Sequence, residues 1–102
     1  MNYVLIDDDE LIHELWKLAS REKEIKLNCF ASVDDFLKQA QSLDHDSQVY
    51  IDSNLKNTRG EEEAIKVFEA GFSQIFIATG YDPDSISAPD FVKGIVGKRP
   101  PF

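Results

Sequence analysis

Polar side chains of three chemical kinds follow the short apolar runs of this sequence. They are the carboxylates of Asp7, Asp8, Asp9 and Asp52, the hydroxyl of Thr79 and the ammonium of Lys98. Two carboxylates about 4 Å apart repel each other by roughly 4 kcal/mol at an effective dielectric constant near 20, so a cluster of them needs positive charge. Lys98 would supply one charge, and Mg²⁺, which binds carboxylates and water, would supply the rest. A carboxylate beside a metal, a lysine and a hydroxyl is an arrangement for phosphoryl transfer, with the carboxylate as nucleophile.

The segments between these residues alternate between strand and helix patterns. Short apolar runs predict strands at 3–6, 26–30, 49–51, 75–78 and 95–96. Helical spacing predicts helices over 10–22, from the N-cap Ser32 to about residue 40, and from Glu61 to the cap Gly71. The alternation predicts a doubly wound α/β domain, in which helices cover both faces of a five-stranded parallel sheet. Ligands bind such sheets at the carboxyl ends of the strands, which is where the polar groups lie.

Composition limits the class of protein. The 102 residues predict one domain over 1–102, and a hydrophobic content of 42% is enough for a packed core. The formal net charge of −8 argues against binding to nucleic acid or to an anionic membrane surface. The single cysteine, Cys29, cannot form an internal disulfide, and residues 1–6 run into three aspartates, unlike a signal peptide. We therefore expect a soluble cytoplasmic protein.

Four motifs together resemble the receiver domains of bacterial two-component response regulators, the CheY-like domains. They are the stretch 4–12 with its acidic triplet, the loop from Asp52 to Gly60, the run Ala78–Gly80, and Lys98 ahead of Pro100–Phe102. These motifs span essentially the whole chain, and they follow one another in the family's order. The resemblance implies the sheet order 2-1-3-4-5, and a phosphoprotein of signal transduction rather than an enzyme.

The resemblance also implies a role for each polar residue. Asp52 would be the phosphoacceptor, taking a phosphoryl group from a histidine of a histidine kinase or of a phosphotransfer protein. The Mg²⁺ ligands would be Asp7, Asp8, Asp52 and the backbone carbonyl of Asn54. Thr79 would hydrogen-bond the phosphoryl oxygens, and Lys98 would pair with the phosphoaspartate. Gly60 would sit in the turn before the third helix, and Gly80 would leave the phosphoryl group room.

The sequence departs from the family on one side of the domain. The chain ends soon after Lys98, so we expect the final helix to be missing, and Pro83 and Pro89 predict a shortened fourth helix. Ile95 stands where a switch Tyr or Phe is common, and Lys56 replaces a common proline and would point its charge at a phosphoryl donor. Receivers signal through this side, so we expect a signalling or relay module without its own output domain. We also expect part of one sheet face to be covered only by the helix over 10–22 and the tail Pro100–Phe102, and to bind a downstream protein or a second copy of the chain.

Other interpretations of the same residues stay open. Asp9 is better suited to cap a helix than to bind a metal, and Asp52 could serve only to turn the chain. Lys93 is a rival for the role given to Lys98. The chain could also be an interaction module that keeps the fold but works without phosphorylation. A phosphatase of the haloacid dehalogenase type is a third hypothesis, but that chemistry needs an acid where this chain has Asn54.

Overall fold

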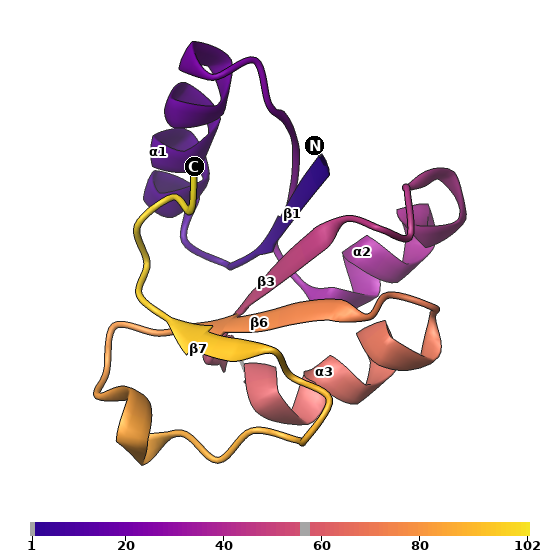
Figure 1. Cartoon of the computed structure of the whole chain (residues 1–102), viewed down its shortest axis with the longest axis vertical. Helices are drawn as coiled ribbons and strands as arrows, with labels where there is room; N and C mark the ends of the chain where they lie inside the picture. The colour runs from indigo at the N-terminus through magenta and orange to yellow at the C-terminus, as the bar shows by residue number, and fades with distance from the viewer. Residues whose placement is uncertain (1, 56–57) are drawn as a thin grey trace.

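A parallel sheet of five strands forms the centre of the computed structural model, which describes residues 2–55 and 58–102 (Figure 1). The strands are β1 (Asn2–Ile6), β2 (Lys26–Phe30), β3 (Gln48–Asp52), β6 (Gln74–Ala78) and β7 (Gly94–Val96). Their order is β2-β1-β3-β6-β7, and every neighbouring pair is parallel. This confirms the predicted order, and each predicted strand to within one residue at either end. Lys56, expected to face a phosphoryl donor, lies outside the described residues.

Helices and one short hairpin connect the strands. They are α1 (Glu10–Glu22), α2 (Val33–Gln39) with the 3₁₀ turn η1 (Ala40–Ser42), the hairpin of β4 (Asn54–Leu55) and β5 (Thr58–Arg59), and α3 (Gly60–Glu69). Asp9 caps α1, because its Oδ1 accepts a hydrogen bond from the Leu11 N–H at 2.9 Å. Ser32 caps α2 in the same way, and Gly71 follows α3 in the left-handed conformation, with φ of 101°. None of the described helices is long and apolar enough to cross a membrane.

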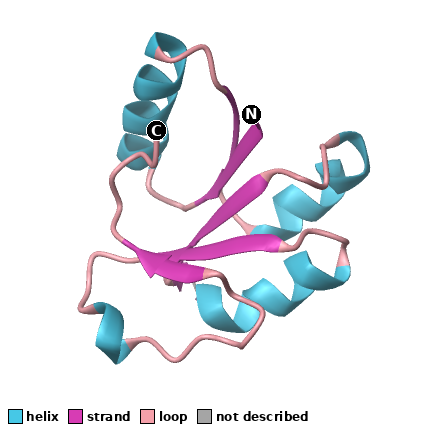
Figure 2. Cartoon of the chain, viewed as in Figure 1, coloured by secondary structure: helices cyan, strands magenta, loops and turns pink. Residues whose placement is uncertain are grey.

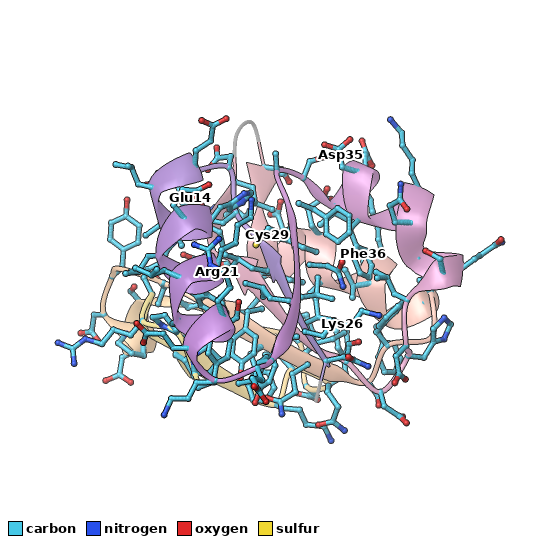
Figure 3. The ribbon with its side chains drawn as sticks, turned by 90° about the horizontal axis from the view of Figure 1, so that it is seen from above. Glu14, Arg21, Lys26, Cys29, Asp35 and Phe36 are labelled. Atoms are coloured by element: carbon cyan, nitrogen blue, oxygen red, sulfur yellow. The ribbon has the colours of Figure 1, made fainter. Side chains whose placement is uncertain are left out.

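The two faces of the sheet carry different side chains, because successive residues of a strand point to opposite faces. One face, covered by α2 and α3, is aliphatic: Val4, Ile6, Val49, Ile51, Ile75 and Ile77. The other, aromatic face carries Tyr3, Leu5 and Tyr50, and these pack against Trp16 of α1. Figure 2 shows α1 on one side of the sheet and α2 with α3 on the other. In Figure 3 the strands lie between α1, which carries Glu14 and Arg21, and α2, which carries Phe36.

The last residues of the chain fold back over the aromatic face, beside α1 (Figure 1). The ring centroid of Phe102 lies 4.9 Å from that of Tyr3 and 5.9 Å from that of Trp16. The Trp16 Nε1–H donates a hydrogen bond to the backbone carbonyl of Lys98 at 2.9 Å. Trp16 is fully buried as a result. The chain's tail thus packs on this face beside α1, as expected, and a partner or a second copy on this face stays a prediction.

The segment between β6 and β7 contains a single 3₁₀ turn, η2 (Pro83–Ser85), and no α-helix among its described residues. Proline suits the start of a turn, where its missing N–H costs nothing, and Asp82 caps this turn by accepting the Asp84 N–H at 3.0 Å. The segment then runs without regular structure through Pro89 to β7. The sequence predicted a shortened fourth helix, and in the structure the 3₁₀ turn is all that forms there.

Removing the ring of Phe102 should open the aromatic face. Phe102→Ala is expected to lower the free energy of unfolding by about 2 kcal/mol, since the ring is half-buried and full burial is worth about 3–5 kcal/mol. The emission of Trp16, the single tryptophan, should shift to longer wavelength as water reaches the indole. Phe68→Ala is the control, because Phe68 stacks on Phe91 and should leave the emission unchanged. An unchanged emission maximum in Phe102→Ala would contradict this packing of the tail.

Candidate functional site

The sheet itself holds the predicted site residues in place, because its hydrogen bonding continues one residue beyond three of the strands. The Asp7 N–H donates to the Phe30 carbonyl at 3.0 Å. The Thr79 N–H donates to the Val96 carbonyl at 2.9 Å, and the Ser53 N–H donates to the Ala78 carbonyl at 3.0 Å. The backbone at each of these strand ends is therefore as fixed as the interior of the sheet.

The same local turn follows β1, β3 and β6. In each case a polar side chain accepts a hydrogen bond from the N–H two residues later, which bends the chain away from the sheet. The three bonds are Asp9 N–H to Asp7 Oδ1 at 2.9 Å, Asn54 N–H to Asp52 Oδ1 at 3.1 Å, and Tyr81 N–H to Thr79 Oγ1 at 3.0 Å. Asp52 therefore does turn the chain, as one interpretation had it, and it does so while joining a cluster of charges.

Three carboxylates and one ammonium meet at this edge of the sheet. Asp7, Asp8 and Asp52 each offer an oxygen, and these oxygens lie within 4.8 Å of one another. Asp7 and Asp52 are buried, whereas Asp8 is exposed. Lys98 Nζ bridges the buried pair, at 2.7 Å from Asp7 Oδ2 and 2.6 Å from Asp52 Oδ1. One positive charge against three negative charges leaves two negative charges in excess, which one divalent cation would neutralise.

Burial and charge shift the pKa values of Asp52 and Lys98. Burial raises the pKa of Asp52, while Lys98 and the Asn54 N–H act in the opposite direction and the charge of Asp7 adds to the rise. Burial alone would lower the pKa of Lys98, but the hydrogen bonds to Asp52 and Asp7, together with their negative charges, outweigh burial and raise it. Lys98 therefore stays protonated at neutral pH, and the ionised form of Asp52 depends on positive charge beside it.

A cavity of about 330 Å³ opens over the cluster. Its lining includes the whole acidic triplet Asp7–Asp9, and also Asp52, Asn54, Gly80 and Lys98. Thr79 is buried and is not among the described residues that line this cavity. Lys93 is exposed and forms no ion pair among the described residues, so the structure brings Lys98, and not its rival, to the carboxylates.

The oxygen-rich lining fits a hard divalent cation such as Mg²⁺, which binds a few carboxylates and waters. The excess negative charge is the observation that favours a cation, and Asp8 has no hydrogen bond or ion pair among the described residues to neutralise it. Asp9 is a poor ligand in comparison, because its Oδ1 is used to cap α1. Candidate ligands are thus Asp7, Asp8 and Asp52, with Asn54 on the cavity wall.

Two neighbours of the site were not expected from the sequence. His13 is half-buried, and its Nε2 lies 2.5 Å from the backbone carbonyl of Asp7. Its position four residues after the cap Asp9 is a signal that it faces back toward the start of the helix. Trp16 fixes the Lys98 backbone through its indole N–H. No sequence pattern connects residues that lie so far apart in the chain.

Comparison with known proteins identifies the fold. No protein-family model matches the chain, and no curated protein matches it. The response regulator TrrA from Thermotoga maritima, solved in complex with Mg²⁺ and BeF, is 20% identical, with a TM-score of 0.77 over 94% of this chain and 84% of TrrA. FixJ-N is 16% identical, with a TM-score of 0.76 over 99% of this chain and 82% of FixJ-N.

A third structure is similar to the same extent. It is a response regulator from Burkholderia pseudomallei with a phosphorylated aspartic acid, a calcium ion and citrate, 17% identical, with a TM-score of 0.75. The match covers 95% of this chain and 59% of that protein. The chain therefore has the CheY-like fold of response-regulator receiver domains.

Proposed function

We propose that this chain accepts a phosphoryl group on Asp52 in a Mg²⁺-dependent reaction and acts as a signalling or relay module. The observation that carries the proposal is the bridge from Lys98 to Asp52 and Asp7, with Asp8 beside it, at the carboxyl edge of the sheet. The phosphorylated aspartic acid of the Burkholderia regulator and the Mg²⁺–BeF of TrrA, on the same fold, support this interpretation.

Asp52 has one oxygen available as a nucleophile. Its Oδ1 lies against Lys98 and accepts the Asn54 N–H, whereas Oδ2 has no hydrogen-bond partner among the described residues. In the proposed step Oδ2 attacks the phosphorus of a phosphohistidine, so that an O–P bond forms while the P–N bond breaks and the nitrogen keeps the electron pair.

The other residues would stabilise the phosphoryl group. Lys98 carries a positive charge next to the attacking carboxylate, and Gly80 leaves space on the cavity wall. The Thr79 oxygen already accepts the Tyr81 N–H, so its hydroxyl hydrogen can be donated. When bound by Asp7, Asp8, Asp52 and the Asn54 carbonyl, Mg²⁺ would neutralise negative charge on the phosphoryl oxygens.

The outer surface of α1 supports a protein as the phosphoryl donor. Leu11, Leu15 and Leu18 are 79%, 49% and 54% exposed, and their spacing places them in one stripe along the helix. The stripe starts two residues after Asp9, which lines the acidic cavity. Exposed apolar surface of this kind marks sites of protein interaction, so a histidine kinase or phosphotransfer protein fits better than a small-molecule donor alone.

Intact-protein mass spectrometry after incubation with Mg²⁺ and acetyl phosphate tests the proposal. A single labile phosphoryl adduct is expected in the wild type and none in Asp52→Asn. No adduct from acetyl phosphate or from a phosphohistidine protein, in a chain that still binds Mg²⁺, would favour the second candidate. That candidate is an interaction module that works without phosphorylation, and the loss of the fourth helix and the presence of Ile95 support it.

Mg²⁺ should stabilise the folded protein, because the carboxylates converge only in the folded state. At a concentration one hundred times the Kd, mass action contributes about 2.7 kcal/mol, which corresponds to a rise in Tm of roughly 10 °C or more. Asp8→Asn should remove most of this rise, whereas Asp90→Asn, an exposed carboxylate outside the cavity, should keep it. Thermal unfolding with and without Mg²⁺ measures the effect, and a full rise in Asp8→Asn would refute the assignment of the pocket.

A further inference from the structure

A second cavity, of about 310 Å³, lies beside the acidic one and shares walls with it. Ser53, Asn54 and Tyr81 line both cavities. The rest of its lining comes from the start of α3 and from the segment that replaces the fourth helix, and includes Glu61 and Ile86. Its volume is at the lower end of the range for small-molecule sites.

Two residues of this cavity each carry a buried polar atom that lacks a partner. Ser53 is 6% exposed and Glu61 is 8% exposed, and neither Ser53 Oγ nor Glu61 Oε1 has a hydrogen-bond partner among the described residues. Among the described side chains, these are the two buried polar atoms without a hydrogen-bond partner, and both belong to residues that line this cavity. Buried polar groups without partners are uncommon and destabilising, so a pair of them calls for a ligand that supplies hydrogen bonds.

The charges around the cavity indicate the kind of ligand. Glu61 lies in the first turn of α3, where a negative charge is favourable. Arg59 also lines the cavity, yet no ion pair joins it to Glu61 among the described residues. A lone cation would be attracted by Glu61 and repelled by Arg59. A molecule that carries both an ammonium and a carboxylate group complements both side chains.

We propose that this cavity binds a small zwitterion of the amino-acid type. A small rotation of the Glu61 and Ser53 side chains would let its ammonium group donate to Glu61 Oε1 and Ser53 Oγ, its carboxylate would face the guanidinium of Arg59, and its apolar part would pack against Ile86. Binding needs no phosphoryl donor. The shared walls at Asn54 and Tyr81 would couple the ligand to the phosphoacceptor, a consequence that rests on the proposed function.

Titration of the isotope-labelled chain with a panel of L-amino acids, followed by amide NMR without any phosphoryl donor, tests binding. Shifts are expected at Ser53, Glu61 and Tyr81 with at least one amino acid. Ethylammonium and acetate, which each carry one of the two charges, should bind at least about tenfold more weakly. Glu61→Gln and Arg59→Gln should each weaken binding to a similar extent, and Glu62→Gln, an exposed neighbour on the same helix, should not.

A stability measurement separates a ligand site from a structural role of Glu61. Glu61→Met removes a buried, unpartnered carboxylate, so it should abolish binding and also raise the Tm of the free protein by several degrees. A fall in Tm would show that Glu61 stabilises the fold and would overturn the proposal. The absence of any shift with every amino acid up to its solubility, or equal binding of ethylammonium, would overturn it as well. These outcomes do not depend on whether Asp52 is phosphorylated.

Discussion

Lys98→Met should lower the free energy of unfolding by about 3 kcal/mol at neutral pH and nearly abolish phosphorylation by acetyl phosphate. The substitution leaves Asp7 and Asp52 buried within reach of each other with no cation between them. Breaking a buried ion pair from one side costs about 3–5 kcal/mol, and the 25% exposure of the Lys98 side chain places the cost at the lower end. Urea unfolding monitored by Trp16 fluorescence measures the loss.

The loss in Lys98→Met should depend on pH in a definite direction. Without the ammonium, the pKa of Asp52 rises further, so its burial costs less as pH falls and it takes up a proton. In the wild type the raised pKa of Lys98 contributes stability that is complete below its usual value of 10.5 and is lost as pH rises through the raised value. The difference in stability between wild type and variant should therefore shrink on acidification and again at strongly alkaline pH.

Two comparisons support the interpretation of that variant. Lys93→Met removes an exposed lysine outside the cluster and should change stability by less than about 0.5 kcal/mol. Mg²⁺ should raise the Tm of Lys98→Met by more than it raises that of the wild type, because the metal then has no ammonium to compete with. Equal stability of Lys98→Met and Lys93→Met at neutral pH would contradict the bridged cluster.

Gly60→Ala should destabilise the protein by roughly 3 kcal/mol or more and slow phosphorylation about a hundredfold. A Cβ atom on Gly60 would lie 2.0 Å from the carbonyl oxygen of Asp52 and 2.8 Å from its carbonyl carbon. These are backbone atoms, so no side-chain rotation relieves the contact. The end of β3 or the start of α3 must move, and either movement displaces the proposed phosphoacceptor.

Gly97→Ala is the matched control for this substitution. A Cβ at Gly97 meets nothing within 4 Å, although the residue lies next to Lys98. Stability and the extent of phosphorylation should both stay close to wild type. Urea unfolding and intact-mass measurement of the adduct check both variants, and a wild-type result for Gly60→Ala would show that α3 does not approach Asp52 as closely as described.

Local sequence patterns predicted the parts of the molecule that depend on local physics. The apolar runs located all five strands of the sheet, and Asp9, Ser32 and Gly71 marked helix ends because caps act through the nearest turn. The meeting of Asp7, Asp8 and Asp52 followed from one rule, that parallel strands bring their carboxyl ends to one edge of the sheet.

Features that depend on contacts distant in the sequence could not be predicted in this way. Gly60 was expected only as a turn residue, whereas its absent Cβ makes room for the backbone of Asp52. The packing of Phe102 on Tyr3 joins the two ends of the chain. The missing partners of Ser53 Oγ and Glu61 Oε1 depend on which side chains pack around them, and local sequence patterns do not show this.

Borohydride reduction of the phosphorylated chain, followed by peptide mass spectrometry, tests the central claim most directly. Borohydride reduces an aspartyl phosphate to homoserine, so the reacted position is recorded permanently in the chain. After incubation with Mg²⁺ and either acetyl phosphate or a phosphohistidine protein, we predict homoserine at position 52 and unmodified aspartate at positions 7, 8 and 9. Homoserine at any position of the acidic triplet, or at none in a folded chain that binds Mg²⁺, would contradict the assignment of Asp52 as the phosphoacceptor.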